Sequence, residues 1–243
     1  MEQATEQRDS HEARAEDGNA AGKTGRSAQK RRAILDAARQ LFLQHGYVST
    51  SMDDVAARAG VSKQTLYKHY GDKRRMFIEL LTGEMGQADG GVAALADAIP
   101  STQDLPADLR AYARAYLSAI MQPDLIRLRR VVIGEAERFP ELAETWYARG
   151  PAAAYDRFAQ WFEVLRARGL LRVDDAHLAA QHFNWLVLSI PLNEAMARPP
   201  TGPADQRELH RYADEGVRVF LAAYARQPPT EPADRTPRRQ ARP

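Results

Sequence analysis

A stretch between residues 59 and 77, AGVSKQTLYKHYGDKRRMF, carries three lysines, two arginines, one histidine and two tyrosines but few apolar side chains. A buried segment would be more apolar, and a solvated surface has no need of the tyrosines. Cations pair with phosphate oxygens, whereas Gln64, Lys63 and Thr65 carry groups that can read adenine, guanine and the thymine methyl in a major groove. These residue types indicate a surface that meets a polyanion, with duplex DNA as the best candidate.

Such side chains must be presented on a helix at a fixed angle, and the sequence predicts a helix-turn-helix. The first of the two helices of this motif, over residues 50–59, would be capped by Thr50, and Asp53 three residues later would complete a capping box. Gly60 ends that helix and supplies the positive φ that a steep turn needs. After a serine cap, a second helix covers 63–70. In this motif the second helix lies in the major groove, with its N-terminal residues toward the base edges.

The predicted contacts divide into recognition-helix and phosphate positions. The recognition-helix side chains expected to reach bases or the adjoining backbone are Lys63, Gln64, Thr65, Tyr67, Lys68 and His69. Phosphates are expected beside Thr50, Tyr70 and Lys73. Tyr67 could equally be half-buried packing. His69 is expected as a surface residue or phosphate neighbour rather than a metal ligand, because no partner ligands lie nearby.

The charge layout agrees with this interpretation. The chain has a net charge of +2, but residues 26–75 hold eleven Lys and Arg against four Asp, a net of +7. Residues 76–226 hold 16 basic and 20 acidic side chains, a net of −4. A basic N-terminal module on a mildly acidic body is the electrostatic pattern of a nucleic-acid binder.

The composition excludes several other classes. The 243 residues include no cysteine, so disulfides, thiolate metal sites and cysteine nucleophiles are excluded. No apolar run approaches the roughly 20 residues of a membrane span, and the N-terminus does not resemble a signal peptide. We therefore expect a cytoplasmic protein. No HExxH, Walker-type or GxSxG motif is present, so we expect no enzyme, no cofactor and no metal.

Apolar residues recur at three- to four-residue spacing, which predicts an all-α chain. We expect a DNA-binding domain over 26–75 and an effector-binding and dimerisation domain over 76–226. Residues 1–25 and 227–243 are polar or Pro- and Arg-rich and are expected to be disordered. Helices are predicted at about 27–45, 73 onward with weak points at its glycines, 105–121, 124–138, 141–149, 150–168, 174–197 with a kink at Pro191, and 205–225.

The body could hold a hydrophobic effector among its aromatic side chains, although aromatic residues at helical spacing are more often core. The candidate effector contacts are Tyr116, Arg130, Trp146, Tyr155, Phe158, Trp161, Phe162, His182 and Trp185. Glu135 and Asn184 are further candidate polar anchors. The two last helices are apolar enough to form a four-helix interface with a second copy.

Residues 28–75 resemble the N-terminal domain of the tetracycline-repressor (TetR) family, and the matching pieces lie in ILDAARQLFLQHGYVSTSMDDVAARAGVSKQTLYKHYGDKRRMF. The resemblance implies an all-α homodimer, a palindromic operator, repression as the common mode, and release by a small effector. It places the nine DNA-contact residues named above at recognition-helix or phosphate positions. Gln64 replaces a glycine common in the family, and YGDK departs from the usual FxSK.

The segment RRVVIGEAERFPELAETWYARGPAAAYDRFAQWF resembles the C-terminal domain of the AefR-like branch of that family. The resemblance does not name a ligand. Two alternatives remain at this stage: an enzyme in a helical bundle, and a helical ligand-binding or interaction protein without operator-specific DNA binding. For a regulator, we expect the effector to shift the helix that begins at residue 73. This shift would change the distance between the two recognition helices of the dimer.

Overall fold

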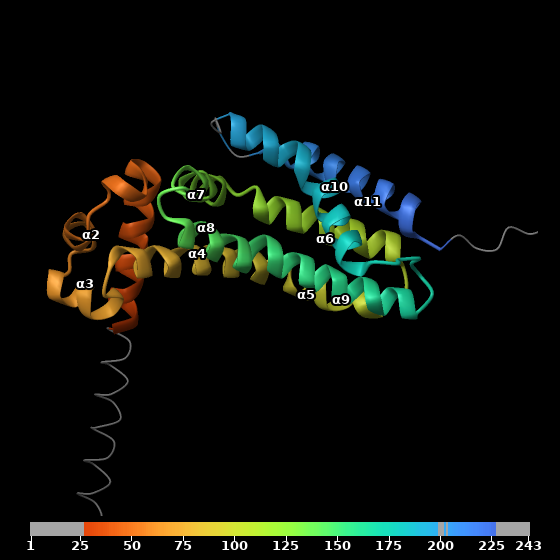
Figure 1. Cartoon of the computed structure of the whole chain (residues 1–243), viewed down its shortest axis with the longest axis horizontal. Helices are drawn as coiled ribbons and strands as arrows, with labels where there is room; N and C mark the ends of the chain where they lie inside the picture. The colour runs from red at the N-terminus through yellow and green to blue at the C-terminus, as the bar shows by residue number, and fades with distance from the viewer. Residues whose placement is uncertain (1–26, 199–201, 203, 227–243) are drawn as a thin grey trace, which may run out of the picture.

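The computed structural model describes residues 27–198, 202 and 204–226, and every element in that part of the chain is helical apart from one isolated bridge between Leu171 and Ala225. The N-terminal helices form a head at one end of an elongated molecule, and the longer C-terminal helices form its body (Figure 1). The predicted all-α fold is confirmed. The terminal segments 1–25 and 227–243, predicted to be disordered, lie outside the described residues.

The head consists of the helical stretch 27–49, α2 (Met52–Ala59) and α3 (Lys63–Tyr70). Gly60 adopts φ of +64°, the left-handed conformation that lets α2 end and α3 begin at a steep angle. Ser62 caps α3 by accepting a hydrogen bond from the backbone N–H of Thr65. The predicted turn glycine and the predicted bounds of the second helix are therefore confirmed.

The predicted cap of α2 is wrong by one residue. Ser51, not Thr50, is the N-cap, and Asp54, not Asp53, completes the capping box by accepting from the Ser51 backbone N–H. Thr50 is instead buried, and its hydroxyl donates to the carbonyl oxygen of Gly46 at 2.8 Å. The Thr50 side chain cannot cap α2 because it closes the preceding turn.

The longer helices follow in order. They are α4 (Lys73–Gly90), α5 (Ala93–Ala98), α6 (Leu105–Ile120), α7 (Pro123–Gly134), α8 (Pro140–Tyr147), α9 (Ala153–Ala167), α10 (Ala176–Ala197) and α11 (Gln206–Tyr224). A short 3₁₀ turn (Ile99–Ser101) follows α5, and a π-helical turn (Ala148–Ala152) joins α8 to α9. No described helix has both the length and the apolar character needed to cross a membrane.

Several predicted boundaries differ from the structure. The helix predicted over 124–138 ends at Gly134, and Gly150 and Pro151 lie within the π turn instead of opening a new helix. Asp175, not Asp174, caps α10, which runs as one helix through Pro191. The helix α4 likewise continues through its glycines to Gly90. At Pro151, at Pro191 and at the glycines of α4, tertiary packing sustains helical backbone that local sequence signals disfavour.

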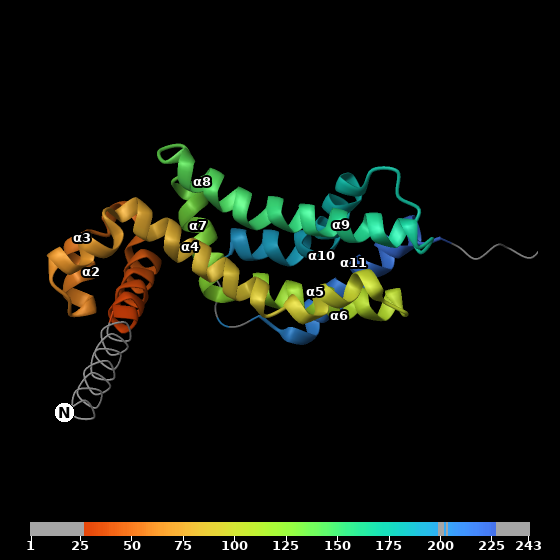
Figure 2. The ribbon, with the colours of Figure 1, turned by 90° about the horizontal axis from the view of Figure 1, so that it is seen from below.

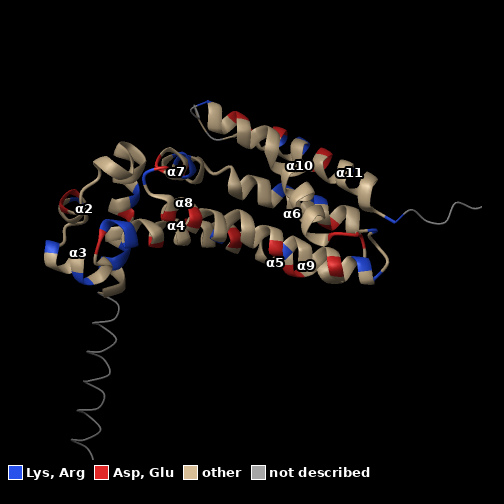
Figure 3. Ribbon diagram, in the orientation of Figure 1, with Lys and Arg blue, Asp and Glu red and all other residues tan. Residues whose placement is uncertain are grey.

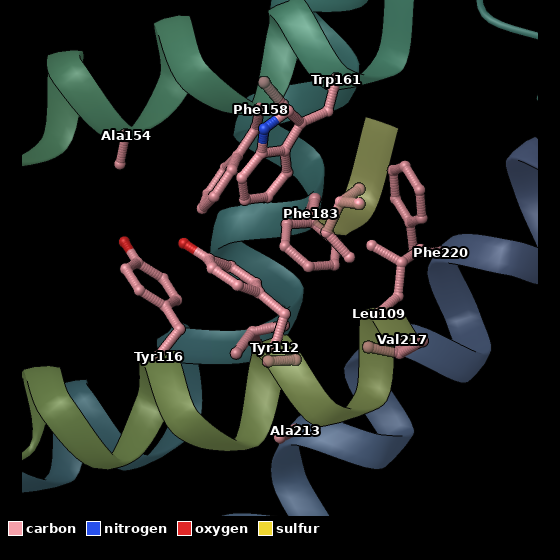
Figure 4. Close-up of a cluster of buried hydrophobic side chains, with 14 of the residues drawn as sticks. Leu109, Tyr112, Tyr116, Ala154, Phe158, Trp161, Phe183, Ala213, Val217 and Phe220 are labelled. Atoms are coloured by element: carbon pink, nitrogen blue, oxygen red, sulfur yellow. The ribbon is translucent and has the colours of Figure 1, made fainter. Parts of the chain in front are cut away.

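Two hydrophobic clusters hold the molecule together. One fills the body between α6, α9, α10 and α11, and includes a set of aromatic rings shown in Figure 4. The other begins in the head and continues through α4 to side chains of α7 and α8, such as Leu128 and Trp146. The boundary predicted between residues 75 and 76 falls inside α4, which leads from the head into the body (Figure 2). That boundary stays a proposal.

Candidate nucleic-acid interface and ligand cavity

One face of α3 is exposed while the opposite face is buried. Lys63, Gln64, Tyr67 and Lys68 are exposed, whereas Leu66 lies in the core of the head. The side chain of Tyr67 is 49% exposed, so it is available for contact rather than committed to packing. Thr65 and His69 are partly exposed. Figure 3 shows Lys and Arg gathered at α3 and the neighbouring helices of the head, while acids and bases mix along the body.

Lys63 forms an ion pair within this surface. Its ammonium lies 2.6 Å from the Asp53 carboxylate, and both side chains are more than half exposed. The hydrogen bond from Lys63 to Asp53 raises the pKa of the lysine. Since exposed ion pairs contribute little stability, the ammonium can exchange Asp53 for a phosphate or a base edge at small cost. Asp53, predicted as a cap, instead pairs with Lys63 on the exposed surface of the head.

Two predicted phosphate contacts have buried side chains. Tyr70 is 2% exposed, and its hydroxyl donates to the carbonyl oxygen of Arg31 at 3.3 Å. Burial raises the pKa of Tyr70 to about 12, so the phenol stays neutral and internally bonded. The Thr50 hydroxyl is already bonded to Gly46. The Tyr70 side chain is therefore not free to reach a phosphate, because it belongs to the packing that holds α3 in place. For Thr50, where a backbone N–H at the helix start is expected near a phosphate, the contact stays a prediction.

Lys73 has an anchoring position at the start of α4. Its ammonium donates to the carbonyl oxygens of Tyr47 at 2.9 Å and Val48 at 3.1 Å, and lies 4.6 Å from the centre of the Tyr47 ring. Partial burial lowers the pKa of Lys73. The lysine thus caps carbonyl groups at the end of the first helical stretch. A phosphate that contacts Lys73 would have to share its ammonium group with these two carbonyl oxygens.

A cavity of about 60 Å³, measured as the space that the centre of a water molecule can reach, lies in the body near the head. Its walls come from α4, α6, α7, α8, the π turn, α9 and α10. Four predicted effector contacts line it: Tyr116, Trp146, Tyr155 and Trp185. Most of the remaining wall is aliphatic, from Ile120, Leu125, Ile126, Leu188 and Leu192.

The polar groups of the wall are few. The Tyr116 hydroxyl donates to the side-chain oxygen of buried Asn184 at 2.9 Å. Asp89 pairs with Arg157 at 3.0 Å between their side chains. Arg129 also lines the cavity, and its buried Nε has no hydrogen-bond partner among the residues that the structure describes. Sequence reasoning weighed Asn184 but missed Arg129 and Asp89, since no local pattern indicates which polar residue of a body helix faces inward.

The other predicted effector contacts lie elsewhere. Phe158, Trp161 and Phe162 pack in the aromatic core: the Phe158 and Phe183 ring centres are 5.2 Å apart, and Trp161 lies edge-on to Tyr112 (Figure 4). Phe158 also packs on Trp161, and Phe162 packs on Phe183 and Phe220. None of these three rings lines the cavity.

The two predicted polar anchors also point away from it. His182 is exposed, and its Nδ1 lies 2.6 Å from the Tyr224 hydroxyl. The Arg130 guanidinium donates to the backbone oxygens of Ala195 and Arg198 at the end of α10. Arg130 therefore ties α7 to α10, while its neighbour Arg129 faces the cavity. Glu135, a further predicted anchor, follows α7 and does not line the cavity.

Comparisons with known proteins match two segments of the chain to family models. Residues 34–80 match the model of the tetR family of bacterial regulatory proteins, and residues 107–226 match that of the C-terminal domain of AefR-like transcriptional repressors. A TetR-family transcriptional regulator from Mesorhizobium loti is 37% identical, with a TM-score of 0.74 and a match covering 83% of this chain and 99% of that one.

Two further relatives bear on function. The flavonoid-responsive regulator FrrA is 31% identical, with a TM-score of 0.67 over 83% of this chain and all of its own. The transcriptional activator FasR of Mycolicibacterium smegmatis is 33% identical over 103 residues, which cover 42% of this chain and 46% of FasR. That match thus spans about half the length of FasR.

Proposed function

The chain belongs to the tetR family of bacterial regulatory proteins and is a DNA-binding transcriptional regulator; on that premise we propose that it represses transcription from a palindromic operator and is released by a small, mostly apolar effector. Repression is supported by the match of the body to the AefR-like repressor domain. The proposal includes no catalytic activity. A regulator of this kind acts where the chromosome is, which in a bacterium is the cytoplasm.

The exposed face of α3 supports operator reading through the major groove. Gln64 at the second position of α3 has an amide that can pair bidentately with adenine, and Lys63 can donate to guanine. Lys68 and Tyr67 lie one turn further on, where the groove wall brings phosphates close. This exposed face, held rigidly by Leu66 and Tyr70 beneath it, is the observation that carries the proposal.

Dimerisation through α10 and α11 is supported by the apolar side chains that these helices expose. The exposed members are Leu178, Trp185, Leu186, Ile190 and Val219. Apolar groups gathered on one face favour burial against a second copy. A symmetric dimer would place two copies of α3 about one DNA turn or more apart, roughly 34–36 Å per turn.

The helix α4 connects the cavity wall to the head, so a change at the cavity can move the head. Its first residue, Lys73, holds the backbone of Tyr47 and Val48 in the head. Its last turns supply Met85, Ala88 and Asp89 to the cavity wall. A ligand that displaces this end of α4 would tilt the helix and change the separation of the two α3 helices.

Two substitutions test the proposed roles. Gln64→Ala should relax base preference at one operator position, a loss of about 1–3 kcal/mol of discrimination. Lys68→Ala should instead weaken binding to all sequences alike and lower the salt slope by about one. Gel-shift titrations on sites selected from random DNA measure both. The role assignment is wrong if Gln64→Ala leaves base preference unchanged or if Lys68→Ala changes it.

Asp53 gives a third prediction. Asp53→Asn removes a negative charge from the DNA-facing surface and frees Lys63, so operator affinity should rise about two- to tenfold at low salt. The exposed Asp97 on α5 in the body provides the matched control, and Asp97→Asn should leave affinity unchanged. Equal effects of the two variants would show that Asp53 does not lie on the surface that binds DNA.

A further inference from the structure

The wall of the cavity carries an unbalanced positive charge. Two arginines and one acid line it: Arg129, Arg149 and Asp89. The acid is already paired, since the Asp89 carboxylate lies 3.0 Å from the Arg157 guanidinium. In the part of the chain that the structure describes, neither Arg129 nor Arg149 forms an ion pair. Arg149 is exposed in the π turn, whereas Arg129 is partly buried between α6 and α10.

Of the two arginines in the wall, Arg129 is the one whose burial destabilises the folded protein. A guanidinium stays charged at any physiological pH, and a charge taken out of water without a counter-ion destabilises the fold. The neighbours that Arg129 does have are the phenols of Tyr116 and Tyr155, which are neutral. Burial is the main influence on Arg129 and lowers its pKa. Within the described residues nothing in the protein compensates this charge.

We propose that the effector is an amphipathic anion, with a carboxylate or comparably acidic group that pairs with Arg129 and an apolar body that lies among Trp146, Tyr155 and Leu188. This inference rests on the proposed function in taking the cavity as the effector site. A neutral ligand would leave the guanidinium uncompensated, and a cation would be repelled by both arginines. Charge-assisted, bidentate pairing is what a guanidinium offers to a planar carboxylate.

The position of Arg129 also links recognition to release. The space inside the wall is small, so an apolar body that enters it packs directly against the wall residues. At one side the π turn approaches α4 closely: a side-chain carbon added at Gly150 would lie 3.2 Å from the Met85 sulfur. An apolar body anchored by its anionic end at Arg129 would press on this contact, and Met85 belongs to the end of α4 that enters the wall.

Two matched pairs of probes test the charge preference: benzoate with benzamide, and 2-naphthoate with 2-naphthamide. Binding is followed by the fluorescence of the tryptophans, two of which, Trp146 and Trp185, line the cavity. We expect the wild-type protein to bind at least one carboxylate about tenfold or more tightly than its amide. Arg129→Gln should abolish that preference and leave amide affinity within about threefold.

Arg127→Gln is the control, because Arg127 lies on the same helix, is exposed and pairs with Asp124 outside the cavity. It should keep the wild-type preference. The inference is overturned if neither carboxylate binds at millimolar concentration, if the amides bind as tightly as the carboxylates, or if Arg129→Gln keeps the preference.

A ligand-free measurement gives a second readout. Arg129→Met keeps much of the side-chain volume but removes the uncompensated charge, so it should raise Tm by about 2–4 °C. A lower Tm than wild type would mean that Arg129 stabilises the fold itself, and would overturn the inference. Operator binding is measured in parallel for each variant. If the wild-type protein binds no operator, the proposed function is refuted. If it binds an operator but does not prefer carboxylates to amides, only the proposal of an anionic effector is refuted.

Discussion

Replacing Gly216 with alanine is expected to lower the free energy of unfolding by about 1–3 kcal/mol, because overpacking against backbone cannot relax by a side-chain rotation. Gly216 lies in α11 where that helix crosses α10. A side-chain carbon there would lie 2.6 Å from the carbonyl oxygen of Leu186 and 3.1 Å from the Cα of Val187. The two helices would have to separate, which would loosen the core around Phe220.

Urea denaturation at a fixed protein concentration measures this loss. Gly83→Ala is the matched control: Gly83 lies inside α4, and a side-chain carbon there meets nothing within 4 Å. That variant should gain about 0.5–1 kcal/mol, since alanine restricts the unfolded chain and favours helix. If Gly216→Ala were as stable as wild type, the close crossing of α10 and α11 would be contradicted.

The second large effect is expected at the proposed dimer surface. Ile190→Asp should convert the dimer to a monomer and weaken operator binding about 100-fold or more, because a monomer loses the linked second half-site. Ile190 is 58% exposed on α10, among the other apolar side chains of this face. A carboxylate there would have to be buried against a second copy, which is unfavourable without a partner charge.

Sedimentation and gel-shift titration together measure mass and affinity. The control is Ile133→Asp, where the same residue type is 53% exposed on α7, outside the two helices proposed to form the interface. That variant should remain dimeric and bind operator as the wild type does. A dimeric Ile190→Asp protein with wild-type affinity would place the interface elsewhere.

The helix-turn-helix could be predicted from the sequence because its signals are local. Gly60 ends α2 and Ser62 caps the start of α3, so both signals lie next to the helices that they bound. The two tyrosines of α3 show how far that reasoning extends. Tyr70 follows Leu66 by four residues and therefore shares its buried face, whereas Tyr67 follows by one and is exposed. Helical spacing alone contained the information that separates them.

The cavity could be predicted only in part, because the inward-facing residues depend on how each helix is rotated against its neighbours. Arg129 and Arg130 are adjacent in α7, yet one faces the cavity and the other binds the carbonyl groups at the end of α10. Among the aromatic residues of α9, Tyr155 lines the cavity and Phe158 is core. Composition cannot distinguish these cases, since tertiary packing sets the rotation.

The most direct test of the account is methylation interference on a DNA site selected by the wild-type protein, since guanine N7 lies in the major groove. If α3 of a symmetric pair enters that groove, methylated guanines should block binding in two related half-sites whose centres lie about 10 base pairs or more apart. Binding that tolerates guanine methylation throughout the selected site, or interference in a single unpaired patch, would contradict the account.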